Sequence, residues 1–187
     1  MIKHVFFAVT IGLIAFFLYL AQYTGAFKSV FVGIDQRGPY TLIYKEHVGA
    51  YHKIVEKIQQ VENWAKENKL DCKFTFGEFF DDTGLTEEGR LKSRAGCLIE
   101  EKNSTAQTVL KTLTLPVDIL RAEYTKTKAV VALFTGSPGI GPLKVYPKAE
   151  NFIHEGKLKR KGAVIEIYEV LDSQTMNTTY IFPIEEL

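Results

Sequence analysis

The chain has 187 residues, which is enough for one domain of ordinary size or for two intertwined halves. Of its 23 Lys and Arg residues, one, Lys3, precedes an apolar N-terminal segment, and the remaining 22 equal the 22 Asp and Glu residues. The body of the protein therefore lacks the basic excess that nucleic-acid-binding domains carry, and we expect no nucleic-acid partner.

Residues 5–21 form an uncharged, apolar segment directly after Lys3 and His4. About 17 to 20 such residues span a bilayer core, so the pattern predicts a membrane anchor within residues 1–26 of a single-pass protein. A cleaved signal peptide is the alternative, although the segment exceeds the usual h-region of ~7–15 residues. The short N-terminus favours an orientation that places the rest of the chain outside the cytoplasm.

The next part of the chain alternates between two periods. Apolar alternation and turn residues predict strands at residues 27–34 and 40–48. Apolar residues at helical spacing then predict an amphipathic helix over residues 51–68. Two further strands are expected at residues 71–80 and 93–100. This gives the order strand, strand, helix, strand, strand.

The chain contains an internal repeat. Residues 62–70 and 150–158 are identical at five of nine positions, at an offset of 88. Carried forward without a gap, this offset places Glu78 over Glu166, in the middle of two apolar strands. Agreement of helix, strand and acid favours duplication over chance similarity.

The repeat predicts an α+β domain over residues 27–187, with halves at about 27–100 and 117–187. In this fold, duplicated βαββ halves form a curved antiparallel sheet with two helices on one face. The polar segment 101–111 is interpreted as the linker between halves. Residues 136–142 are rich in Gly and are expected to be a loop, followed by a shortened helix that starts at Pro147.

Cys72 and Cys97 are expected on neighbouring strands. A disulfide between them is one possibility outside the cytoplasm, and two reduced, partly buried thiols are the other. The sequence contains no C-x-x-C spacing, and we expect neither a metal nor a cofactor.

The two repeated acids are the main functional candidates. On a strand, Glu166 shares a face with Tyr168, and Glu78 shares one with Phe80. A carboxylate among apolar and aromatic groups is costly unless it is paired, so it suits recognition of a cation or a hydrogen-bond donor. Its pKa is expected to be raised. A hydrogen bond to a neighbouring Tyr, or a place at an exposed edge, would explain either acid without a ligand.

Three stretches resemble GyrI-like effector-binding domains. They are residues 44–51 (Tyr-Lys-Glu-His-Val-Gly-Ala-Tyr), residues 79–97, and residues 165–168 together with Phe182-Pro183-Ile184. The resemblance is strongest to a membrane-anchored branch, which includes a testis-expressed ER-phagy receptor. It implies a duplicated βαββ fold with a ligand cleft between the halves and a ligand-facing Glu at Glu166.

In regulator relatives the cleft binds amphipathic cationic drugs, and some relatives hydrolyse small strained-ring compounds. This chain shows neither a DNA-binding helix-turn-helix nor the disordered tail of an autophagy receptor, so we expect neither of those functions.

The leading hypothesis is a membrane-tethered, non-enzymatic domain that binds a small apolar or cationic ligand. Two alternatives remain: a protein-interaction module at the membrane, with a protein partner in the same cleft, and a small-molecule hydrolase that uses Glu166 as base. The residues expected to line the cleft are Glu166, Tyr168, Glu78, Phe80 and Tyr44.

Overall fold

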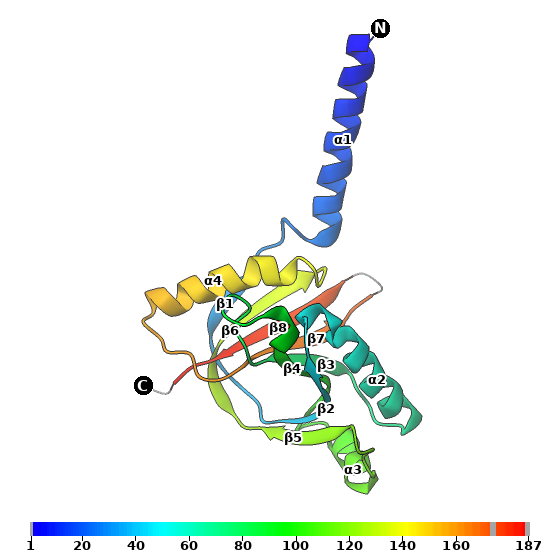
Figure 1. Ribbon diagram of the computed structural model, residues 1–187, viewed down its shortest axis with the longest axis vertical. Helices are drawn as coiled ribbons and strands as arrows, with labels where there is room; N and C mark the ends of the chain where they lie inside the picture. Colours follow the sequence, from blue (N-terminus) through cyan, green and yellow to red (C-terminus); the bar gives the residue numbers. More distant parts are fainter. Residues whose placement is uncertain (1, 173–174, 186–187) are drawn as a thin grey trace.

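A computed structural model describes residues 2–172 and 175–185 (Figure 1). The last two residues of the predicted second half, 186 and 187, lie outside this description. The helix α1 (Ile2–Thr24) projects from an α+β domain that contains one sheet and the remaining helices. The predicted fold class is confirmed.

The helix α1 is exposed along most of its length, and its last residue, Thr24, is hydrogen-bonded to the domain through Ser137. Its 23 residues extend about 35 Å at 1.5 Å per residue. Residues Lys3–Thr24 have a mean hydropathy of 2.2 and are long and apolar enough to cross a membrane. A signal sequence near an N-terminus has the same properties, so length and composition alone do not establish a membrane span.

The domain is built on an 8-stranded antiparallel sheet in the order β1-β6-β8-β7-β3-β4-β2-β5. Alternating apolar side chains explain the strands, because one set of alternate residues packs under the helices and the other packs inside the curve of the sheet. The strands are β1 (Phe31–Arg37), β2 (Tyr40–Val48), β3 (Phe74–Phe79), β4 (Lys92–Glu100), β5 (Leu120–Tyr124), β6 (Thr127–Gly136), β7 (Val164–Val170) and β8 (Met176–Pro183).

The two halves exchange their first strands. Strand β1 belongs to the first half by sequence but pairs with β6 of the second half, from Phe31 opposite Leu133 to Arg37 opposite Thr127. In the same way β5 pairs with β2 of the first half. The halves meet through β3 and β7 at the centre of the sheet. Neither half therefore forms a complete sheet by itself.

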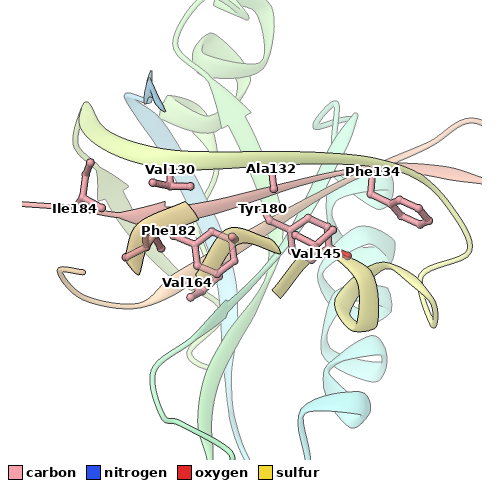
Figure 2. Packing of buried hydrophobic residues seen from close by; sticks show 10 residues of the cluster. Val130, Ala132, Phe134, Val145, Val164, Tyr180, Phe182 and Ile184 are labelled. Carbon is pink, nitrogen blue, oxygen red and sulfur yellow. The ribbon is translucent and has the colours of Figure 1, made fainter. Parts of the chain in front are cut away.

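Two helices lie on one face of the sheet: α2 (Ile54–Glu67) and α4 (Gly141–Glu155). Helix α2 buries Val61 and Ala65 against Ile43 and Cys97. Helix α4 buries Val145, Ala149 and Ile153 against β6 and β8, and Figure 2 shows part of this cluster. The opposite, concave face has its own core, in which Leu42, Phe76, Ile165 and Ile181 take part. Single-turn helices η1 (Tyr51–Lys53) and η2 (Glu88–Arg90) complete the first half.

Two sequence interpretations were wrong in detail. The predicted linker contains a helix, α3 (Ser104–Thr112), whose N-terminal N–H of Ala106 is capped by the Asn103 side chain. Helix α4 begins at Gly141 rather than at Pro147. Pro142 occupies its first turn, where a missing N–H costs nothing, and Pro147 lies inside the helix.

Cys72 and Cys97 form a disulfide, with their Cα atoms 5.5 Å apart. This resolves the alternative that the sequence left open. The bond ties the segment before β3 to the middle of β4, beneath α2, where Cys97 is fully buried.

Candidate functional site

The strand β7 places Glu166 near the centre of the sheet. Glu166 lies opposite Tyr180 on β8 and opposite Gly77 on β3. Because paired residues share a face of the sheet, Glu166, Tyr180 and Gly77 all face the helices. Glu166 lies where α4 covers the sheet, as its hydrogen bond to Tyr146 of α4 shows.

Two tyrosines hold the Glu166 carboxylate. The Tyr146 hydroxyl donates a hydrogen bond of 2.8 Å to Oε1, and the Tyr168 hydroxyl donates one of 3.0 Å to Oε2. Glu166 is only 5% exposed. Burial raises the pKa of Glu166 to about 7, although both hydrogen bonds act to lower it. The carboxylate therefore changes charge close to neutral pH.

The tyrosines around Glu166 are themselves strongly perturbed. Burial, and next the negative charge of Glu166, raise the pKa values of Tyr146, Tyr168 and Tyr180 above the usual tyrosine range. They consequently stay protonated and can act as hydrogen-bond donors. The Tyr146 ring packs edge-on against the rings of Tyr180 and Phe182, with centroids 6.0 Å and 5.4 Å away.

A glycine makes room for this cluster. Gly141, the first residue of α4, lies so close to the Tyr180 hydroxyl that a Cβ at this position would collide with it. Tyr180 is 1% exposed and packs against the α4 core, so it has little space to move away. The glycine therefore lets the start of α4 lie directly over the tyrosines.

In the part of the chain that the structure describes, the Glu166 carboxylate accepts hydrogen bonds only from the tyrosines Tyr146 and Tyr168. The positive charge of Arg160 acts to lower the pKa of Tyr146, but Arg160 itself forms an ion pair with Glu150 at 2.6 Å. When Glu166 ionises, its charge is thus met by neutral donors and not by a salt bridge. A buried carboxylate of this kind has a surplus negative charge that a cation could neutralise.

The other predicted acid has a different environment. Glu78 forms an ion pair with Arg94, whose guanidinium carbon lies 4.7 Å from the Tyr44 ring centroid and 5.7 Å from that of Phe80. Burial is the largest influence on the pKa of Arg94 and lowers it, but the hydrogen bond and charge of Glu78 outweigh it, so the pKa is raised. This cluster is an internally neutralised ion pair.

The five predicted cleft residues fall into two groups on opposite faces of the sheet. Glu78 pairs with Ile165, while Glu166 pairs with Gly77, so the two carboxylates point in opposite directions. Glu166 and Tyr168 lie together on the helix-covered face. Glu78, Phe80 and Tyr44 gather around Arg94 on the concave face.

This geometry also corrects the repeat alignment. In the two helices the offset of 88 holds, because it aligns the buried Val61 with the buried Ala149 and the buried Ala65 with the buried Ile153. In β3 and β7 the same offset would relate residues on opposite faces, so Glu78 is not the counterpart of Glu166. A shift of one residue, which aligns Gly77 with Glu166, restores the common face.

Sequence analysis missed three residues of these clusters: Tyr146, Tyr180 and Arg94. Tyr146 was missed because the helix was expected to start after it, at Pro147. The alternation of Thr178, Tyr180 and Phe182 indicates that these residues share one face of a strand, but it does not reveal that this strand lies beside the one that carries Glu166. Among the described residues no group of three or more His, Cys, Asp or Glu side chains could hold a metal ion.

The fold and the site define an α+β domain of two strand-exchanged halves with a buried, tyrosine-bound carboxylate. Neither a protein-family model nor a curated protein sequence matches the chain. Solved structures nevertheless have the same fold. The C-terminal domain of EcmrR superimposes with a TM-score of 0.61 at 13% identity, covering 84% of this chain and 99% of that domain.

Two further structures agree. EcmrR in its complex with DNA gives a TM-score of 0.62 at 11% identity and covers 94% of this chain. This chain spans 65% of the length of that EcmrR chain. SAV2435, solved with bound tetraphenylphosphonium, gives 0.52 at 12% identity and covers 83% of this chain and 94% of SAV2435. At these identities the similarity shows the fold.

Proposed function

We propose that this protein is a small-molecule-binding domain of the GyrI-like kind, tethered to a membrane, that recognises a lipophilic cation at Glu166. The observation that carries the proposal is the buried Glu166 carboxylate, which is held by Tyr146 and Tyr168 and forms no ion pair with any cation among the described residues. Recognition is assigned to Glu166 and Tyr168. Glu78, with Phe80 and Tyr44, is assigned to the ion pair with Arg94 instead.

The chemistry of the site supports a cation with apolar substituents. Ionising Glu166 in a poorly hydrated environment is unfavourable, and a bound cation offsets this cost by direct charge pairing. The hydroxyls of Tyr146 and Tyr168 reach Glu166, and Tyr180 packs against Tyr146, so aromatic rings lie close to the carboxylate and could attract a cation that binds over their faces. Apolar substituents on the cation would replace contacts that the tyrosines now make with each other.

The comparisons support the same class of ligand. SAV2435 shares the fold and was solved with tetraphenylphosphonium, a lipophilic cation. The motifs at residues 44–51 and 165–168 resemble GyrI-like domains independently of the structure. Fold and motifs together favour a ligand-binding role over the protein-interaction role.

Membrane tethering is supported by α1, which is apolar and separate from the domain core. The disulfide between Cys72 and Cys97 favours an oxidising compartment for the domain, because cytoplasmic thiols are kept reduced. We therefore propose that α1 is an uncleaved anchor and that the domain lies outside the cytoplasm.

The proposal can be tested by equilibrium dialysis of the full chain in lipid nanodiscs with tetraphenylphosphonium. Tetraphenylborate, which has a similar shape and the opposite charge, is the matched control ligand. We expect wild-type protein to bind the cation better than the anion and Glu166→Gln to lose this preference. Cation affinity should rise between pH 6 and pH 8 as Glu166 ionises. Equal cation binding by both proteins would reject Glu166 as the recognition group.

A hydrolase is a second candidate because the Glu166 pKa of about 7 suits a general base. Each carboxylate oxygen accepts one tyrosyl hydrogen bond and keeps a second lone pair, through which Glu166 could take a proton from a bound water. Any compound that binds in the dialysis assay should be recovered and checked for hydrolysis. Product formation that Glu166→Gln abolishes would favour the enzyme.

A further inference from the structure

Exposed apolar side chains gather at the end of the domain where α1 leaves it. In Figure 1 this end lies beneath α1, opposite α3 and β5. A surface of this kind on a soluble domain marks a contact site. We call it the anchor-side surface, and it consists of Phe27, Phe31, Leu133, Leu143, Val170 and Leu171.

The position of α1 relative to this surface is fixed by hydrogen bonds. The Ser137 N–H donates to the carbonyl of Thr24, the last residue of α1, at 3.0 Å. The Lys144 ammonium on α4 donates to the carbonyls of Ala26, at 2.5 Å, and of Lys28. The helix end is therefore attached to α4 and to the β6–α4 loop, both in the second half.

The strand register brings the β7–β8 hairpin to the same end. Gly136, which precedes Ser137, pairs with Met176 on β8, and Met176 pairs with Val170 on β7. Val170 and the following Leu171 are exposed. They lie two strands from the point where α1 is attached, which is about 10 Å across the sheet.

The same end offers polar groups suited to lipid head groups. A shallow cavity of about 360 Å³ is lined by Lys28, Ser29, Phe31, Leu133 and Thr135, and so combines a basic side chain with aromatic and aliphatic ones. On α1, the Tyr19 and Tyr23 rings stack with centroids 5.8 Å apart in its last turns. Tyrosines are enriched where a helix leaves the hydrocarbon core.

We propose that the anchor-side surface lies against the interfacial region of the bilayer that α1 enters, so that the domain is held flat on the membrane rather than tethered at a distance. This inference rests on the proposed membrane anchor. If α1 ends at the interface, two residues must lie close to that interface. Leu143 is next to Lys144, which is bonded to the segment after α1, and Phe31 follows Thr24 by only seven residues. Their burial among lipid head groups and upper acyl chains removes apolar area from water, and Lys28 contributes attraction to anionic lipid.

The test uses single Cys substitutions in the full chain, labelled with an NBD fluorophore without reductant, so that the disulfide is kept. Leu143→Cys and Leu171→Cys report on the anchor-side surface. Val117→Cys, which is fully exposed and lies between α3 and β5, is the matched control. Each protein is reconstituted into phosphatidylcholine–phosphatidylglycerol vesicles with and without a lipid that carries a nitroxide at a shallow acyl position.

We expect the nitroxide to remove most of the NBD emission at positions 143 and 171 and little of it at position 117. Vesicle flotation separates the two hypotheses. Protein that does not float with the vesicles would reject the anchor itself. Protein that floats, with positions 143 and 171 quenched no more than 117, would overturn the bilayer contact and leave the anchor intact. Disulfide crosslinking between unlabelled Leu143→Cys copies without quenching would assign the surface to a second copy.

Discussion

The Tyr146 hydroxyl on α4 donates a 2.8 Å hydrogen bond to Glu166 on β7, and this bond joins the helix layer to the sheet at a titrating group. The carboxylate is stable there in two forms, as a neutral acid and as an anion held by two donors. The balance between these forms links the stability of the domain to pH, and it links ligand binding to pH with the opposite sign.

Stability should fall as the pH rises through the range in which Glu166 ionises. The folded-state pKa of about 7 lies above the usual 4.5, so the folded protein binds more protons between these values. The free energy of unfolding is then highest below about pH 4.5 and decreases by up to about 3 kcal/mol above pH 7. Glu166→Gln should lose this decrease and be the more stable protein at pH 8. Thermal unfolding of the full chain in micelles at pH 5 and pH 8 measures this change in stability. An equal change in unfolding temperature for the wild type and Glu166→Gln would contradict the prediction.

Removing the Tyr146 hydroxyl should destabilise the protein most at high pH. Tyr146→Phe leaves the buried Oε1 of ionised Glu166 without its donor, at a cost of about 1–3 kcal/mol. Tyr40→Phe is a matched control, because Tyr40 lies on the concave face and stacks on Tyr124. We expect Tyr146→Phe to lower the unfolding temperature at pH 8 well below that of Tyr40→Phe. A similar effect of both variants would show that the hydrogen bond contributes little.

Gly141 should not tolerate a methyl group. In Gly141→Ala the new Cβ collides with the Tyr180 hydroxyl, and displacing this buried ring costs about 1–3 kcal/mol. Gly139→Ala, two residues earlier in the loop before α4, is the control because its Cβ would be 4.0 Å from the nearest atom. Chemical denaturation should separate the two variants, and cation binding should weaken only in Gly141→Ala. Equal midpoints would mean that α4 can move away at no cost.

Replacing only one partner of the Glu78–Arg94 ion pair should destabilise the protein more than replacing both partners. Arg94→Met leaves the nearly buried Glu78 without its counter-ion, which costs about 3 kcal/mol. The double variant Glu78→Leu/Arg94→Met removes both charges and should recover most of this loss. Unfolding midpoints of the two single variants and the double variant form a cycle. A double variant as unstable as the sum of the singles would show that the charges do not interact.

The sequence predicted the fold because its periods are clear. The alternation of Val164, Glu166 and Tyr168 identified a strand with an acid on one face, and the spacing of Val61 and Ala65 identified the buried side of a helix. The short helix α3 was missed because it is mostly polar. Its signal was Asn103 as a cap, followed by Ala106 and Leu110 four residues apart.

The site was only half predictable. Glu166 and Tyr168 are neighbours along one strand, so local alternation places them together. Tyr146 and Tyr180 come from other elements, and their approach depends on strand order and helix position. Glu78 was wrongly aligned with Glu166. Alternate residues of a strand point to opposite faces of the sheet, so a one-residue error in the repeat alignment places a side chain on the wrong face.

The exchange of first strands affects how the protein is made. Strand β1 is synthesised directly after α1, but its partner β6 emerges only about a hundred residues later, and such distant pairing is slow. With about 5–20 residues added per second, β1 waits several seconds with its edge unpaired. Because β6 is the only strand beside β1 in the sheet, a nascent chain that stops before β6 has no partner strand for β1.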